Sequence, residues 1–94
     1  MTEMDKLEDY LEANGFNYFR KPLYDGEQII VYNNRGVQLW DAVCHSGSYG
    51  HERGLLEIMG DITKKRLCDN ITLDDVEGYL TAENIIERLE GVKC

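Results

Sequence analysis

Most side chains that could do chemistry lie in one short stretch, residues 41–51. This stretch contains both histidines of the chain, with a carboxylate, a thiol, two serines and a tyrosine. Three kinds of site use such groups: a metal centre, an anion-binding loop, and a nucleophile paired with a histidine. The candidate site residues here are Asp41, His45, Ser46, Ser48, Tyr49 and His51.

A metal centre would use Asp41, His45 and His51 as ligands. If residues 41–45 form a strand, Asp41 and His45 share a face but lie roughly 13 Å apart along it. That distance is too long for one ion unless the strand bends. The sequence also lacks the close-spaced ligand patterns of zinc sites.

The other two kinds of site depend on the loop at residues 46–50. Backbone N–H groups at the start of a following helix could hold an anion, although the loop lacks the Gly-Lys-Ser/Thr of a P-loop. Cys44 and His45 are neighbours on the predicted strand, so they point to opposite faces and cannot pair. Ser46 or Ser48 could still pair with His51 within the loop.

A purely structural interpretation explains the same residues. Asp41 would tie neighbouring strands or a turn, His45 would end a strand, and Tyr49 would close the core. On this interpretation we predict no catalytic residue, no metal and no cofactor, and we expect that the chain is not an enzyme.

The elements that position this stretch are predicted from hydrophobic periodicity and from capping residues. Thr2 and Asp5 form a capping box, and Met4, Leu7 and Leu11 recur at helical spacing up to Asn14-Gly15. Alternating residues predict a first strand from Phe16, which Pro22 makes unsuitable as a central strand. A turn at Asp25-Gly26 leads to a second strand over 28–32, and a central third strand follows over 37–45.

The second half of the chain is predicted to be mainly helical. Leu55, Ile58, Met59 and Ile62 form a stripe that predicts a helix over 51–62, followed by a charged connection over 63–70. Residues 71–80 fit either a short helix capped by Thr72 or an extended segment on the sheet edge. Thr81 begins the last helix, and Gly91 ends it.

We therefore predict an α+β fold in the order α-β-β-β-α-α. A three-stranded antiparallel meander, with a possible fourth short strand near 76–80, packs against the helices. Ninety-four residues suit one domain, 1–94. The three cysteines predict no disulfide framework, and the acidic start of the chain is unlike a signal peptide. No apolar run approaches the ~20 residues of a membrane span, so the expected compartment is the cytoplasm.

The net charge of −8 is concentrated at the two ends of the chain. The charge balance is −4 over residues 1–14, +1 over 15–68 and −5 over 69–94. Such a chain is unsuited to bind nucleic acid directly, and its expected partner is a basic or nucleic-acid-binding protein. The candidate acidic surface forms only if both ends pack on one side of the sheet. It consists of Glu8, Asp9, Glu12, Asp69, Asp74, Asp75 and Glu77.

Three segments carry a resemblance: VQLWDAVCHSGSYG at 37–50, GLLEIMG at 54–60 and VEGYLTAENII at 76–86. In these segments the chain resembles a group of small uncharacterised proteins from phages and mobile elements of Gram-positive bacteria. The resemblance implies a phage or prophage origin and an intracellular accessory role, and it transfers no functional residue. The layout and charge are also similar to those of one kind of anti-CRISPR inhibitor.

Four functional hypotheses follow. The first is a non-enzymatic interaction or regulatory protein of a phage or mobile element. The second is an acidic mimic of nucleic acid that inhibits a DNA- or RNA-handling protein. The third is a small ligand- or anion-binding domain, or an enzyme, that uses residues 41–51. The fourth is a homodimer, in which two copies pair through an unpaired sheet edge.

Overall fold

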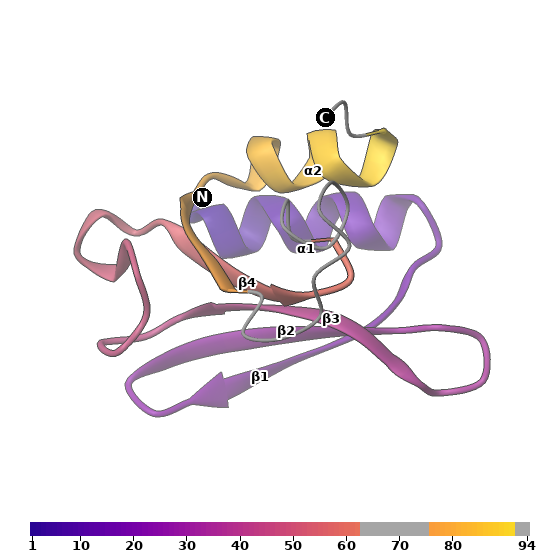
Figure 1. Ribbon diagram of the computed structural model, residues 1–94, viewed down its shortest axis with the longest axis horizontal. Coiled ribbons are helices and arrows are strands. Elements are labelled where there is room, and N and C mark those ends of the chain that lie inside the picture. The colour runs from indigo at the N-terminus through magenta and orange to yellow at the C-terminus, as the bar shows by residue number, and fades with distance from the viewer. Residues whose placement is uncertain (63–75, 92–94) are drawn as a thin grey trace.

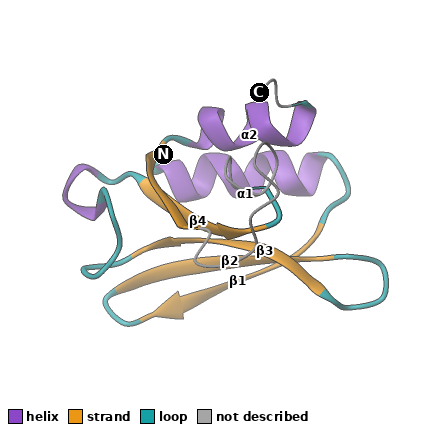
Figure 2. Cartoon of the chain, viewed as in Figure 1, coloured by secondary structure: helices purple, strands orange, loops and turns teal. Residues whose placement is uncertain are grey.

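The fold consists of two layers, a sheet and a pair of helices (Figure 1). The computed structural model describes residues 1–62 and 76–91. Within this part of the chain, five strands form one antiparallel sheet in sequence order, and both α-helices lie on the same face of it (Figure 2). The elements are α1 (Glu3–Ala13), β1 (Asn17–Leu23), β2 (Gly26–Tyr32), β3 (Gln38–Cys44), the 3-10 helix η1 (His51–Arg53), β4 (Leu56–Gly60), β5 (Val76–Leu80) and α2 (Ala82–Glu90).

Helix α1 begins and ends where the sequence predicts. The Thr2 hydroxyl accepts the backbone N–H of Asp5 at 3.0 Å, and the Asp5 carboxylate accepts the N–H of Thr2 at 3.0 Å. This capping box satisfies N–H groups that the first turn leaves unpaired. Gly15 follows the helix with φ +74°, a left-handed conformation that glycine adopts readily. The predicted apolar stripe is buried and consists of Met4, Leu7 and Leu11.

The first three strands form the predicted meander. β3 is the third of five strands, which confirms its central position. Its residues Trp40, Ala42 and Val43 are buried, so both faces of this strand are covered by protein. β1 lies at the edge of the sheet, where the missing N–H of Pro22 costs no inter-strand hydrogen bond.

The turn between β1 and β2 lies one residue earlier than predicted. Leu23 pairs with Gly26, so Tyr24 and Asp25 form the two-residue loop. Gly26 belongs to β2, and a Cβ at this position would lie 1.8 Å from the carbonyl oxygen of Cys44. The glycine therefore allows close approach of two backbones, while Tyr24 takes the left-handed conformation with φ 54°.

The predicted helix over 51–62 is wrong. Only His51–Arg53 is helical, as one 3-10 turn, and Leu56–Gly60 forms β4 beside β3. Leu56 and Ile58 are buried while Met59 is exposed, which is the period-two alternation of a strand. The sheet therefore has five strands where we expected three or four.

The extended alternative for residues 71–80 is confirmed for the part that the structure describes. Val76–Leu80 forms β5, in which Val76 pairs with Met59 and Leu80 pairs with Leu56. The predicted charged connection over 63–70, the Thr72 cap, Cys68 and Cys94 lie outside the described residues.

Helix α2 also matches its predicted boundaries. Thr81 and Asn84 form a capping box, and Gly91 follows the last turn. Ile85 is buried, while Ile86 and Leu89 are half-buried. No helix among the described residues is both long enough and apolar enough to cross a membrane.

The two helices run parallel to each other. Near their starts, the Glu3 carboxylate accepts the backbone N–H of Ala82 at 2.7 Å. Near their ends, the Tyr10 hydroxyl donates to the Glu90 carboxylate at 3.2 Å. These contacts join the two ends of the chain into one helical layer, defined here as α1 and α2 together.

Candidate functional site

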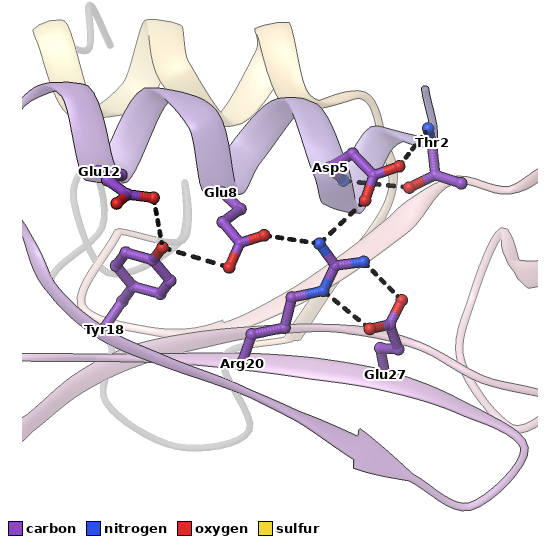
Figure 3. A network of polar contacts seen from close by, with 7 residues as sticks. All are labelled: Thr2, Asp5, Glu8, Glu12, Tyr18, Arg20 and Glu27. Atoms are coloured by element: carbon purple, nitrogen blue, oxygen red, sulfur yellow. Dashed lines mark hydrogen bonds and ion pairs between the residues drawn. The ribbon is translucent and has the colours of Figure 1, made fainter.

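A network of charged groups joins α1 to the sheet (Figure 3). The Arg20 guanidinium on β1 pairs with Asp5 at 2.9 Å and with Glu8 at 2.8 Å, both on α1. It also donates two hydrogen bonds, at 2.8 and 2.7 Å, to the Glu27 carboxylate on β2. Only 19% of the Arg20 side chain is exposed, so these carboxylates replace most of its water. They raise the pKa of Arg20, mainly through the hydrogen bonds that its guanidinium donates to Glu27.

Tyr18 extends this network toward the end of α1. Its hydroxyl lies 3.2 Å from carboxylate oxygens of both Glu8 and Glu12 (Figure 3). Burial and the two carboxylates disfavour a phenolate, which raises the pKa of Tyr18 to about 12. The group therefore acts as a neutral hydrogen-bond donor between the strand and the helix.

Some residues of the predicted acidic surface are paired within the chain, and others are exposed. Glu8 is tied to Arg20 and Tyr18, and Glu77 on β5 forms an ion pair with Arg88 of α2. Asp9 and Glu12 are exposed on α1. Asp69, Asp74 and Asp75 lie outside the described residues.

The helical layer supplies acidic residues that the sequence-based surface omitted. Glu83, Glu87 and Glu90 are exposed on α2. Their i, i+4, i+7 spacing, opposite the buried Ile85, is the signal that could have identified them. The two helices together carry eight carboxylates and two cations, a balance of −6. Both cations contact carboxylates, Lys6 with Glu3 and Arg88 with Glu77.

The stretch at residues 41–51 is organised by hydrogen bonds within the chain. Asp41 points away from the helical layer, where its carboxylate accepts an N–H of Gln28 on β2 at 2.7 Å. Burial raises the pKa of the Asp41 carboxyl. The structure thus makes Asp41 a cross-strand carboxylate, as the structural interpretation predicted. Among residues 1–62 and 76–91, no group of three or more His, Cys, Asp or Glu side chains could hold a metal ion.

Ser48 has a structural role in the loop. Its hydroxyl donates to the carbonyl oxygen of His45 at 2.8 Å and accepts the N–H of His45 at 3.0 Å. The side chain is buried, and this hydroxyl closes the turn after β3. Pairing of Ser48 with His51 as nucleophile and base receives no support from this geometry.

His45 and Ser46 contact the turn between β1 and β2. The His45 ring packs edge-on against Tyr24, with ring centroids 5.2 Å apart, and its Nδ1 accepts the N–H of Gly47 at 3.0 Å. The backbone N–H of Ser46 donates to the Asp25 carboxylate at 2.9 Å. This hydrogen bond is the main reason that the pKa of Asp25 is lowered, with a smaller contribution from His51.

Tyr49 does not close the core, because 62% of it is exposed. Its N–H donates to Glu57 at 3.1 Å, and its carbonyl oxygen accepts the N–H of Tyr79 on β5 at 3.3 Å. A Cβ on Gly78 would lie 2.3 Å from that of Tyr49, so glycine is needed where the loop meets β5. His51 begins a 3-10 turn of three residues, so the long helix that the anion-site hypothesis requires does not follow the loop.

The charged network predicts how stability depends on pH. The Thr2 N–H and the Arg20 guanidinium lower the pKa of the Asp5 carboxyl from 3.8 to about 2. A carboxyl with a lowered pKa stabilises the fold above its unfolded pKa, and this stabilisation is lost as the pH falls through the folded pKa. We therefore expect the urea unfolding midpoint to decrease between pH values of about 4 and about 2.

The Asp5→Asn variant should have a smaller decrease over the same range, since it has no carboxyl to protonate. Asp9→Asn, on the exposed face of the same helix, serves as the control and should follow the wild type. Equal slopes for Asp5→Asn and the wild type would contradict the role of the network.

Two surfaces thus remain as candidates for function. The helical layer presents exposed carboxylates, and in the loop over 45–51 the side chains of His45 and Ser48 form hydrogen bonds that hold the loop. Neither surface could be interpreted from a relative. Comparison of the chain with protein-family models, with curated proteins and with solved structures found no match.

Proposed function

We propose that this protein is a non-enzymatic interaction protein that binds a basic surface of a protein partner through its helical layer. The observation that carries the proposal is that α1 and α2 lie side by side on one face of the sheet with five exposed carboxylates. These are Asp9, Glu12, Glu83, Glu87 and Glu90.

The distribution of cations supports an acidic working surface. Lys6 and Arg88 are the only cations of the two helices, and each contacts a carboxylate. The exposed acids therefore keep most of their charge, and they attract Lys and Arg side chains over about 10 Å at 0.1 M salt. Such complementarity mainly accelerates association and selects the partner.

The partner is a protein rather than a nucleic acid, because phosphates would be repelled by this surface. The resemblance to small phage and mobile-element proteins supports an accessory or regulatory role in such an element. A basic partner in that setting is a protein that itself handles DNA or RNA.

Mimicry of nucleic acid is the second candidate, and one specific observation favours it. Glu83, Glu87 and Glu90 form a row along α2, and Asp9 is exposed on the parallel α1, whereas Glu12 points toward Tyr18 on β1. Packed helices lie about 8–10 Å apart. The row on α2, with Asp9 on the neighbouring helix, could occupy a groove that binds a phosphate backbone, in which case duplex DNA or RNA would compete for the same partner.

A pair of single substitutions tests the working surface. Glu87→Lys changes the helical layer, and Glu52→Lys makes the same charge change at an exposed position in η1. We expect Glu87→Lys to reduce recovery of the partner from a nuclease-treated host lysate by about tenfold at low salt, and Glu52→Lys to leave recovery near the wild-type level. Quantitative mass spectrometry of the captured proteins measures this difference.

Two further measurements, one at rising salt and one with added duplex DNA or RNA, distinguish the two candidate functions. The wild-type complex should dissociate as salt rises toward about 1 M, where the screening length is about 3 Å. Release by added duplex DNA or RNA indicates the mimic, and release by salt alone indicates a basic partner surface of another kind. Equal recovery with Glu87→Lys and Glu52→Lys would remove the helical layer as the working surface.

A further inference from the structure

The edge strand β1 has backbone groups that face away from the sheet. Within residues 1–62 and 76–91, β1 pairs only with β2, so no strand of this part of the chain pairs with its outer edge. Leu23 and Gly26 flank a two-residue turn and therefore form a hydrogen-bonded pair. Such pairs alternate with non-hydrogen-bonded pairs along an antiparallel ladder, so every second residue of β1 turns its N–H and C=O outward. These outward residues are Tyr18, Arg20 and Pro22.

The hydrogen-bonding groups of this outer edge end at both sides of a short central part. Pro22 has no N–H to donate. At the other end, the N–H of Phe16 donates to the carbonyl oxygen of Leu11 at 3.0 Å, in the connection that follows α1. Only Tyr18 and Arg20 therefore offer both an N–H and a C=O to a further strand.

We propose that β1 pairs antiparallel with β1 of a second copy, with Tyr18 opposite Arg20 and Phe19 opposite itself, to form a symmetric dimer. The two-fold axis passes through the Phe19 pair and is perpendicular to the sheet. Tyr18 of each copy exchanges two backbone hydrogen bonds with Arg20 of the other, which satisfies all of the outward N–H groups of β1. The homodimer expected from an unpaired sheet edge is thereby assigned to β1.

The neighbouring registers satisfy fewer backbone groups. Sliding one copy by two residues in one direction sets Arg20 opposite Arg20 and Tyr18 opposite Pro22. This register brings like charges together and lacks the N–H of Pro22 on each side. Sliding by two residues in the other direction sets Arg20 opposite Phe16, whose N–H is already bonded to Leu11. The positions of Pro22 and Phe16 thus select a single register.

The side chains of β1 fit the same register. Arg20 points toward α1, so its neighbours Phe19 and Lys21 point to the other face of the sheet. Phe19 is 57% exposed, and on the two-fold axis it meets its own copy in a non-hydrogen-bonded pair, where side chains lie closest together. Aromatic pairs are among the favourable cross-strand contacts. Lys21 faces the neutral Asn17 of the second copy, so no like charges meet on this side.

The two helical layers would lie on the same face of the joined sheet, because the axis is perpendicular to it. Each layer has a charge balance of −6, so the layers repel each other at low salt. Near the axis the repulsion is partly offset, because each Arg20 stands opposite Tyr18 of the second copy, which lies beside two carboxylates of α1. The dimer would present twice the acidic surface of one copy.

The first test measures the mass of the protein against concentration by sedimentation equilibrium, at about 0.15 M salt, where the screening length is about 8 Å. We expect the wild type to dimerise at high concentration. Phe19→Asp sets two carboxylates directly opposite each other and should weaken dimerisation at least about tenfold. Val37→Asp is the matched control, because Val37 is also 57% exposed but lies between β2 and β3. A wild type that stays monomeric, or equal effects of the two variants, would overturn the proposal.

A cysteine pair tests the register directly. In the proposed dimer the Cα atoms at position 19 lie about 4.5 Å apart, within the range that a disulfide spans. Phe19→Cys should therefore form a disulfide-linked dimer when oxidised glutathione is added at a concentration where sedimentation shows dimers. Lys21→Cys is the control, because the two copies of this position lie roughly 13 Å apart along the paired strands.

Mass spectrometry of the digested protein identifies a disulfide between the two copies of position 19 and distinguishes it from bonds formed by the native cysteines. We expect this disulfide to form at least about tenfold faster than the disulfide between the two copies of position 21. Equal rates at the two positions, or a dimeric Phe19→Cys variant that forms no such bond, would rule out pairing through β1 in this register.

Discussion

Replacing Arg20 with methionine should lower the free energy of unfolding by about 3 kcal/mol. The substitution keeps much of the side-chain volume but removes the guanidinium. The carboxylates of Asp5, Glu8 and Glu27 would then remain close together with no cation between them. These carboxylates keep partial contact with water, which places the effect at the lower end of the range for a broken buried ion pair. Urea unfolding at neutral pH measures the loss.

Two control variants show whether geometry or charge alone is responsible. Lys6→Met removes a cation from an exposed pair with Glu3, so we expect a loss of about 0.5 kcal/mol or less. Arg20→Lys keeps the positive charge but cannot donate two hydrogen bonds to Glu27, and its loss should lie between the other two. A similar loss for Arg20→Met and Lys6→Met would show that the network contributes little to the attachment of α1.

Replacing Gly60 with alanine should destabilise the protein by about 3 kcal/mol or more, through steric overlap and backbone strain together. A Cβ at this position would lie 2.5 Å from the carbonyl oxygen of Leu39 and 2.6 Å from the Cα of Trp40. Backbone atoms of the central strand β3 cannot move away without disturbing their own hydrogen bonds. Gly60 also has φ +126°, which residues with a side chain rarely adopt. Thermal and urea unfolding both report this loss.

Gly36→Ala is the matched control that measures the cost of backbone strain without steric overlap. Gly36 has φ +79°, but no atom lies within 4 Å of the position that its Cβ would take. We expect a loss of about 1 kcal/mol, from conformational strain alone. If both substitutions cost the same, β4 would not approach β3 as closely as the structure describes.

Gly60 also shows why the second half of the fold was mispredicted. In the sequence, Leu55, Ile58, Met59 and Ile62 match a helical stripe as well as Leu56 and Ile58 match a strand, because the segment is short. The choice depends on β3, whose unpaired edge offers hydrogen bonds to a strand but none to a helix. A glycine that permits close backbone approach then has a role that the local pattern does not express.

The candidate sites show the same division between local and tertiary information. Tyr18 and Arg20 are two positions apart on a strand, so the sequence alone predicts that their side chains point to the same face of the sheet. Their partners on α1 and β2 depend on how the helix crosses the sheet, which no short-range pattern contains. The exposed Glu83, Glu87 and Glu90 likewise gain a meaning only once α2 lies beside α1.

The sequence by itself determined the elements whose signals are local. Both helices have capping boxes and terminal glycines, and the meander of β1, β2 and β3 follows from alternation and turn residues. The tertiary structure decided three further features: the strand at Leu56–Gly60, the turn at Tyr24-Asp25, and the joining of two acidic chain ends into one helical layer. The physical reason is how far apart along the chain the interacting residues lie. Caps and turns act through hydrogen bonds between residues a few positions apart, whereas strand pairing and close backbone approach depend on residues that are distant in the chain.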